Sequence, residues 1–276
     1  MSYRTRNLLM VLLLPVLFGS CSENKKNLSG LDIELFQETP VWDLAKAVRD
    51  ENVDEIKRIL MYRKVKVDYQ EPTFGESLLL WAVWSNHYKS AKALLEGGAN
   101  PNLPDHQDGK TPFIFSAEKF ETSDYLKLLL THGGNINFVT TNDSTNMYTT
   151  PLVTASYHRL ESVKLLVDAG ADINYVDKGF RSPLSAAFTF KKVEIIRYLL
   201  IDKGAQYDIP MGETVDGKPL TIANHLRTLV FPLDSKQYKV KMEIVKYLKT
   251  KGIDYFKTPI PRHYHKNYNK DFLERY

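Results

Sequence analysis

The sequence has almost no cysteine, because Cys21 is the only one among its 276 residues. A single thiol cannot form a disulfide within the chain, so the fold must be held together by packing alone. Hydrophobic residues make up 43% of the composition and charged residues 25%. These fractions are ordinary for a soluble globular protein and supply enough apolar material for a core. Disorder of the whole chain is therefore not expected.

The sequence also lacks a strong net charge of either sign. Its 37 Lys and Arg residues against 33 Asp and Glu residues give a formal net charge of +4. Arg4 and Arg6 lie in a segment that we expect to be removed, and without them the balance is 35 against 33. A nucleic-acid-binding domain usually carries a clear positive excess. We therefore expect no nucleic-acid partner.

The hydrophobic run near the start of the chain is too short to span a bilayer. It covers residues 8–18, follows two arginines, and is typical of the apolar region of a signal peptide. Two small residues then precede Cys21 directly, which resembles the cleavage site of bacterial lipoproteins. Phe18 and Gly19 depart from the common pattern, which has Leu and then Ala or Ser at these two positions.

The lipoprotein resemblance implies that residues 1–20 are a signal peptide and that Cys21 carries lipid. Several buried acyl chains, at roughly 0.8 kcal/mol per CH₂, would hold the protein durably on a membrane. Residues 21–40 are then the lipidated cysteine and a polar tether. The implied location is the bacterial cell envelope, facing the periplasm, and Ser22 slightly favours the outer over the inner membrane. The alternative is an ordinary cleaved signal peptide in which Cys21 is incidental.

What the sequence does contain is an internal repeat with a period near 34 residues. A leucine-rich run followed by glycine occurs four times, and these glycines are spaced by 35, 37 and 34 residues. About 21 residues upstream of each glycine, a Ser or Thr precedes a Pro or an apolar residue, and small residues follow. The glycines are Gly98, Gly133, Gly170 and Gly204, and the upstream residues are Ser77, Thr111, Thr150 and Ser182.

These residue types predict two helices in each repeat. A Ser or Thr side chain accepts a hydrogen bond from a free N–H at the start of a helix, and Pro fits the first turn. Small residues keep the first helix thin, so that neighbouring repeats can approach closely. Apolar residues at helical spacing give the second helix a buried stripe, and glycine then ends it in a left-handed conformation.

The repeats resemble ankyrin repeats, whose pattern is roughly G-x-T-P-L-h-x-A-A, a second helix, and G-A-D-x-N. This resemblance implies an all-α solenoid of about six helix-turn-helix units joined by hairpins. We expect this domain over residues 41–254, with an insertion near residues 230–239 and a solvated tail over residues 255–276. Strong repeats cover about residues 75–102, 109–137, 146–174 and 178–208, and weak cap repeats cover about residues 41–70 and 217–254.

No catalytic or cofactor-binding pattern is present in the sequence. It contains no phosphate-binding loop, nucleophile elbow or H-E-x-x-H motif. His263 and His265 alternate in a Tyr- and Lys-rich stretch, yet no Cys and no nearby pair of carboxylates completes a metal site. We expect no enzyme activity, no cofactor and no metal. An enzyme site around His225, His263 and His265 is the alternative, and it requires the three side chains to lie together.

The ankyrin resemblance implies that a protein partner binds the hairpin tips and the exposed ends of the first helices, which line a concave groove. Aromatic residues and Arg are frequent at binding hot spots. Packing on a neighbouring repeat is an equally good explanation for Trp84 and Tyr157, and is the expected one for Phe188. The candidate partner-binding residues are Phe74, Trp84, Glu118, Lys119, Met147, Tyr157, Phe180 and Arg181.

The sequence therefore predicts a membrane-anchored, non-catalytic scaffold in the bacterial cell envelope. We expect it to be a monomer that binds a protein through its groove. A sharper version is an immunity or inhibitor protein that neutralises a toxin or an enzyme in the same compartment. Nothing in the sequence selects that version.

Overall fold

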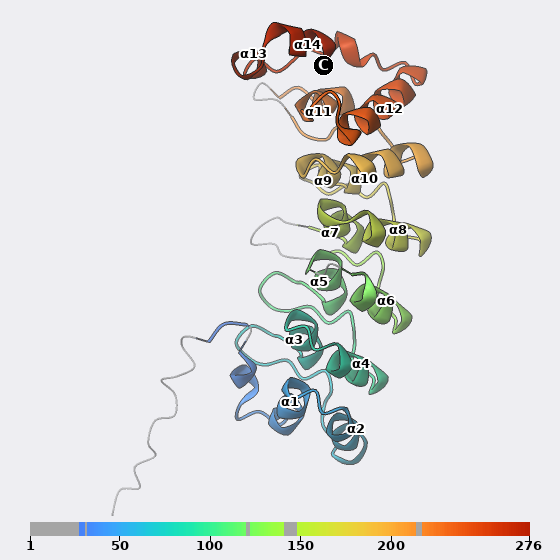
Figure 1. Cartoon of the computed structure of the whole chain (residues 1–276). Helices are drawn as coiled ribbons and strands as arrows, with labels where there is room; N and C mark the ends of the chain where they lie inside the picture. The colour runs from blue at the N-terminus through green and yellow to red at the C-terminus, as the bar shows by residue number, and fades with distance from the viewer. Residues whose placement is uncertain (1–27, 31, 120–121, 141–147, 214–216) are drawn as a thin grey trace, which may run out of the picture.

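A computed structural model describes residues 28–30, 32–119, 122–140, 148–213 and 217–276. Cys21, the expected signal peptide and Met147 lie outside these residues, and so does the side chain of Lys119. The described residues form six successive pairs of helices that stack into an elongated array (Figure 1). The pairs are α1 (Trp42–Arg49) with α2 (Val53–Tyr62), α3 (Leu78–Trp84) with α4 (Tyr88–Glu96), α5 (Pro112–Lys119) with α6 (Asp124–Thr131), α7 (Pro151–His158) with α8 (Leu160–Asp168), α9 (Pro183–Thr189) with α10 (Val193–Arg197), and α11 (Ile222–Thr228) with α12 (Lys236–Thr250).

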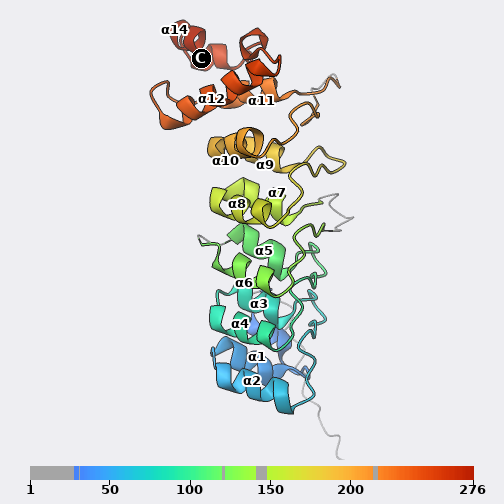
Figure 2. The same cartoon turned by 90° about the vertical axis from the view of Figure 1, so that its right-hand side faces the viewer.

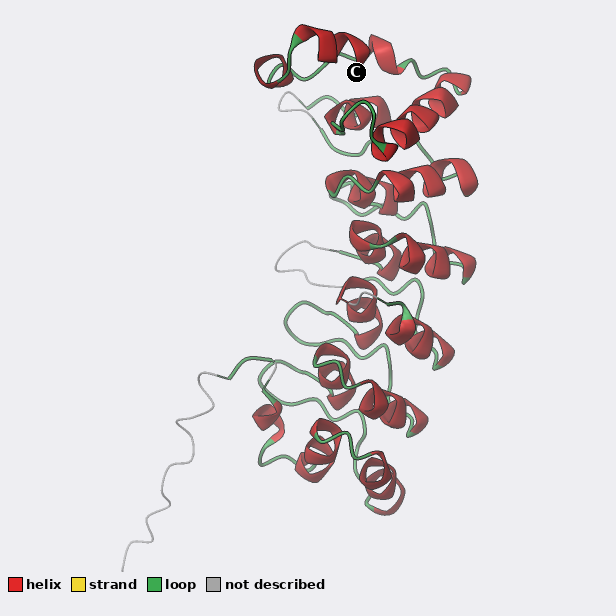
Figure 3. Cartoon of the chain, viewed as in Figure 1, coloured by secondary structure: helices red, strands yellow, loops and turns green. Residues whose placement is uncertain are grey.

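The described parts of the connections between successive pairs project from the same side of the stack. In Figure 1 they lie on the left, beside the first helices, while the second helices of the pairs lie on the right. Figure 2 shows the same loops gathered along one edge. Within the described part of the chain, β structure is limited to two isolated bridges, Gln70 with Ser77 and Glu213 with Pro219 (Figure 3). The predicted all-α solenoid is therefore confirmed.

The predicted helix starts and stops are both present. Each Ser or Thr accepts a hydrogen bond from the backbone N–H three residues later, at 3.0 to 3.2 Å between nitrogen and oxygen. Each of the four repeat glycines has a positive φ, between 68° and 96°. A side chain would be strained in this conformation, which is why glycine recurs at this point of the repeat.

Asparagine and aspartate side chains link neighbouring repeats at four points. Asp68 accepts from the Asn100 N–H at 2.8 Å, and Asn102 accepts from the Asn135 N–H. The same contact recurs from Asn137 to Asp172 and from Asn174 to Gln206. These hydrogen bonds lie at exposed positions and recur once in each repeat, so they join neighbouring connections at a fixed period.

The second helix of the fifth pair ends in a wider helical turn. The α10 helix continues directly into η3 (Tyr198–Asp202), a π-helical turn. A π turn closes over one more residue than an α turn. The apolar side chains on both sides of this point remain buried, so the wider turn does not interrupt the core.

Removing a helix cap should measurably weaken its repeat. Ser182 and Ser185 form a reciprocal capping box at the start of α9. We expect Ser182→Ala to lower the free energy of unfolding by about 1 kcal/mol, because an N–H at the helix start loses its acceptor. Urea denaturation followed by circular dichroism measures this change. Lys178→Ala, at an exposed position of the preceding loop, is the control and should stay within about 0.5 kcal/mol of the parent.

The chain end is not the solvated tail that the sequence suggested. Beyond α12 it forms η4 (Tyr255–Lys257), α13 (Tyr264–Asn267) and α14 (Lys270–Arg275), which fold back over the last pair (Figure 1). The side chains of Tyr255 and Tyr276 are each only 1% exposed. His263 and His265 do remain exposed, as expected. The predicted insertion is partly the longer helix α12 and partly the connection before it.

Arg227 of α11 joins this terminal segment to the last helix pair through hydrogen bonds. It is 4% exposed, and its guanidinium donates to the carbonyl oxygens of Thr258 at 3.0 Å and Tyr276 at 3.1 Å. A further bond reaches the carbonyl of Tyr255, whose ring lies 3.9 Å from the guanidinium carbon. One buried cation therefore connects three separate points of the terminal segment.

The N-terminal segment is also more structured than a polar tether. Residues 33–36 form η2 (Ile33–Phe36), and its three apolar side chains are buried against α1. Leu28 packs on the same core. The tether predicted for residues 21–40 is therefore wrong for residues 33–36, because burial of Ile33, Leu35 and Phe36 outweighs the polar composition around them.

No helix in the described residues is long and apolar enough to cross a membrane.

Candidate partner-binding groove

A pocket of about 210 Å³ lies on the loop side of the stack, between the third and fourth helix pairs. Its walls come from the first helices α5 and α7 and from the loops that precede them and the fifth pair. Glu118, Tyr157 and Arg181 line it, so three of the predicted partner-binding residues lie together. Lys110, in the loop before α5, lines it as well.

A salt bridge closes one wall of the pocket. Lys110 Nζ lies 3.0 Å from Glu118 Oε2, and both side chains remain about one third exposed. An ion pair with this exposure contributes little to stability. It can therefore open and pair with charged groups of a partner at small cost.

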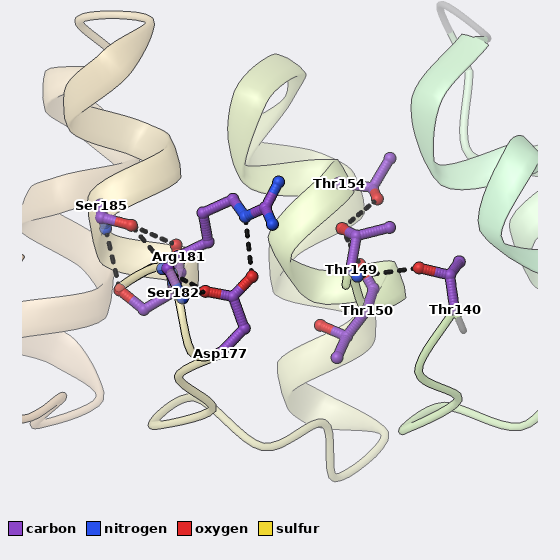
Figure 4. Close-up of polar contacts among 9 residues, drawn as sticks. Thr140, Thr149, Thr150, Thr154, Asp177, Arg181, Ser182 and Ser185 are labelled. Carbon is purple, nitrogen blue, oxygen red and sulfur yellow. Dashed lines mark hydrogen bonds and ion pairs between the residues drawn. The ribbon is translucent and has the colours of Figure 1, made fainter. Parts of the chain in front are cut away.

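Threonine hydroxyls hold the loop before α7 in place. The Thr149 N–H donates to the Thr140 side chain at 3.0 Å, and the Thr140 N–H donates back to the Thr149 carbonyl. The Thr149 hydroxyl also lies 3.1 Å from that of Thr154 in α7 (Figure 4). These bonds join the chain before residue 141 to the chain after residue 147 and fix both to α7.

A buried carboxylate orients Arg181 on the opposite wall. Arg181 Nε donates to Asp177 Oδ2 at 2.7 Å, and the Asp177 side chain is only 1% exposed (Figure 4). Asp177 Oδ1 also accepts from the N–H groups of Gly179 and Arg181. Because the loop backbone holds the carboxylate and the carboxylate holds the guanidinium, the Arg181 side chain lines the pocket already ordered.

Tyr157 and His158 form the floor near the end of α7. The Tyr157 ring packs edge-on against Phe190 of the next pair, with centroids 5.1 Å apart. Burial raises the pKa of the Tyr157 hydroxyl and lowers the pKa of His158, so both groups are neutral at pH 7. Tyr157 therefore both packs on a neighbouring repeat and lines the pocket, which combines the two predicted alternatives.

The other predicted aromatic residues lie elsewhere. The Trp84 ring packs against Phe115 of the next repeat at 5.1 Å, and Phe188 is buried, as expected. Phe74 is half-buried against the core. Phe180 is half-buried at a loop tip with a positive φ of 62°. None of these four lines the pocket.

The pocket also contains residues that the sequence did not single out as partner contacts. His158, Thr140 and Thr154 belong to it. In the sequence, no residue at a recognisable spacing from His158 suggests a shared site. Its neighbours in the pocket come from other repeats. A signal was present nonetheless, since the register that placed Tyr157 at the helix end places His158 directly after it.

The histidines proposed for an enzyme site have different surroundings. His225 is half-buried and its ring packs on Phe188 with centroids 5.5 Å apart, while His263 and His265 are exposed. No group of three or more His, Cys, Asp or Glu side chains arranged for a metal ion occurs in the described part of the chain.

Models of known protein families match the same repeats. A model of three ankyrin repeat copies matches residues 99–177, and a model of many copies matches residues 153–209. A single-repeat model matches residues 74–106. These residues are ankyrin repeats. The matches therefore include the whole pocket between α5 and α7.

Individual relatives agree with this assignment. An ankyrin repeat protein of Acanthamoeba polyphaga mimivirus is 36% identical over 81 residues, which are 28% of this chain and 48% of that protein. One from fowlpox virus is 28% identical over 125 residues, or 45% of this chain and 16% of that protein. This chain therefore matches half or less of the length of these viral relatives.

A solved ankyrin repeat domain supports the fold. The crystal structure of such a domain from Acinetobacter baumannii AYE is 25% identical to this chain, with a TM-score of 0.57. The alignment covers 76% of this chain and 97% of that domain.

Proposed function

We propose that this ankyrin-repeat chain is a non-catalytic scaffold that binds a protein partner at the pocket between α5 and α7. One observation carries the proposal. The ordered Arg181 side chain, the Lys110–Glu118 ion pair and the Tyr157 ring all line the same pocket. An aromatic ring beside charged groups with preset positions is typical of protein recognition.

A pull-down that compares a double variant in the pocket with a matched double variant outside it tests this proposal. We expect the double variant Tyr157→Ala, Glu118→Ala to capture at least about tenfold less partner than the parent. Each hot-spot residue contributes more than about 1 kcal/mol to binding. The control is Tyr62→Ala with Glu55→Ala on α2, which also removes an exposed ring and a paired carboxylate but lies outside the pocket. A partner that binds both double variants equally would contradict the assignment.

We also propose that Cys21 carries lipid and holds this scaffold on a membrane of the bacterial cell envelope, facing the periplasm. Support comes from the apolar run and the small residues before Cys21. Cell fractionation of the parent and of Cys21→Ala tests it. The parent should sediment with membranes and the variant should be released, whereas equal sedimentation of both would show that Cys21 is not the anchor.

A further inference from the structure

The N-terminal segment lies over the groove of the second helix pair. Residues 28–30 and 32–36, which we call the strap, run past α1 toward α3 on the loop side of the stack (Figure 1). At Gly30 the strap touches Glu76, which precedes α3. A methyl group added at Gly30 would overlap Glu76 Oε1 and lie 3.6 Å from Trp84 at the end of α3. At this point the strap therefore lies beside one of the predicted partner-binding residues, Trp84.

The carboxyl group of Glu76, beside the strap, lacks a hydrogen bond to any described residue at one of its oxygen atoms. Glu76 is 1% exposed, and its Oε2 atom has no hydrogen-bond partner among the described residues. The neighbouring Glu71 is equally buried but accepts from three backbone N–H groups, at 2.6 to 3.2 Å. A buried polar atom without a partner is rare in a folded protein and needs an explanation.

The surroundings of Glu76 are acidic. Burial, together with the nearby carboxylates of Glu71 and Asp105, raises the pKa of Glu76 to about 8. A cation placed beside Glu76 would reverse this, because an opposite charge favours the ionised form.

The strap cannot supply that cation. No Lys or Arg occurs between residues 28 and 45, and the strap itself carries Asp32 and Glu34. Asp32 is already used within the strap, where it accepts from the N–H and the hydroxyl of Ser29. The residue in contact with Glu76 is a glycine, which has no side chain to offer. In charge, the strap is a poor match for the surface that it covers.

We propose that Glu76 and Trp84 form a second contact site, which receives an Arg or Lys side chain of the protein partner after the strap has moved away from it. A carboxylate beside an aromatic ring suits such a cation, which pairs with one and lies against the other. The strap then acts as an internal cover that a basic partner displaces. This inference rests on the proposed protein-binding function, which it extends from the α5–α7 pocket to the groove of the second pair.

The site can be tested with a small probe. N-acetyl-arginine methylamide is titrated into the full-length Cys21→Ala chain, labelled with ¹⁵N, and the amide shifts of Gly30, Gly75 and Glu76 are followed. The citrulline analogue, which has the same shape but no charge, is the matched probe. We expect saturable shifts with the arginine probe and at least about tenfold weaker binding of the citrulline probe, because a hydrogen bond to a charged group is lost.

Two variants separate the carboxylate from the strap. Glu76→Gln keeps the shape of the side chain and should weaken arginine binding at least about tenfold. Gly30→Ala introduces the methyl group that overlaps Glu76, so it should open the strap and strengthen arginine binding several-fold. Gly179→Ala is the control for Gly30→Ala, because a methyl group there meets only ordinary contacts, at 3.4 Å or more, and should leave binding unchanged.

The outcomes are distinct from those of the pull-down. Equal binding of the arginine and citrulline probes, or unchanged arginine binding by Glu76→Gln, would overturn this second site. Weaker binding by Gly30→Ala would show that the strap helps to form the site and does not cover it, which also overturns the proposal. None of these results alters whether Tyr157 and Glu118 are needed for partner capture, so failure here leaves the proposed function standing.

Discussion

Replacing Arg227 with alanine should detach the C-terminal segment from the repeats. We expect the free energy of unfolding of the last unit to fall by about 3 kcal/mol, since three carbonyl oxygens lose a charged donor in a buried place. The ring of Tyr255 also loses the guanidinium that lies over it. Because contacts in a solenoid are made mainly between neighbours, the loss should stay in the terminal unit.

Limited proteolysis measures this effect directly. Lys257, Arg262 and Lys266 lie in the terminal segment and provide exposed trypsin sites. Digestion at these sites depends on how often the segment opens, so Arg227→Ala should speed their cleavage on the order of a hundredfold. The control is Arg275→Ala, which removes an exposed arginine from the same segment. Equal cleavage rates in the two variants would contradict the role assigned to Arg227.

The second large effect concerns Lys241, whose side chain is fully buried in α12. Lys241 Nζ donates to the Leu229 carbonyl at 3.1 Å and lies 3.4 Å from the centre of the Tyr276 ring. Burial, together with the nearby charge of Arg227, lowers the pKa of Lys241 to about 6. At pH 7 this lysine is therefore mostly neutral in the folded protein, while in the unfolded chain it is charged.

This difference makes stability depend on pH with a definite sign. Between pH 6 and the ordinary lysine pKa of 10.5, the unfolded chain binds more protons than the folded protein. The contribution of Lys241 to the free energy of unfolding therefore rises with pH across this interval and is lowest below pH 6. Each pKa unit corresponds to about 1.4 kcal/mol, so the full effect is on the order of several kcal/mol.

Lys241→Met should remove this dependence, because methionine fills a similar volume without a charge. We expect the variant to be more stable than the parent by about 2 kcal/mol or more at pH 6, and by less at pH 9. Urea denaturation at pH 6, 7.5 and 9 measures the difference, and Lys239→Met, exposed on the same helix, is the control. A constant difference across the three pH values would show that Lys241 does not titrate in this interval.

Glu76 must be kept constant in that experiment because its effect has the opposite sign. Its pKa is raised from 4.5 to about 8, so the folded protein holds a proton that the unfolded chain releases. The stability from this group is full below pH 4.5 and is lost as pH rises through 8. Comparing Lys241→Met with Lys241 in a Glu76→Gln background separates the two groups.

The repeats could be predicted from the sequence because their signals act over short distances. A cap such as Ser182 bonds to an N–H three residues away, and a glycine such as Gly170 ends the helix in which it lies. Neither depends on what the rest of the chain does. The chain end could not be predicted in this way, since Tyr276 is buried by Arg227 and Lys241, which lie 49 and 35 residues earlier.

The candidate site was predicted in part. Register along the repeat placed Glu118, Tyr157 and Arg181 on the groove side, and the structure brings these three together. The same register placed Trp84 there, but it could not show that residues far upstream lie against it. Cys21, Lys119 and Met147 remain predictions, because the structure does not describe the features that would test them.

The sequence by itself determined the solenoid, since period, caps and glycines specify each helix pair through contacts within about 35 residues. It also determined the lack of any disulfide, because there is one cysteine. Only the tertiary structure decided where the strap and the C-terminal segment pack. The strap over Glu76 and the cation-linked segment on α11 and α12 depend on side-chain burial between distant parts of the chain, and no spacing in the sequence reports such burial.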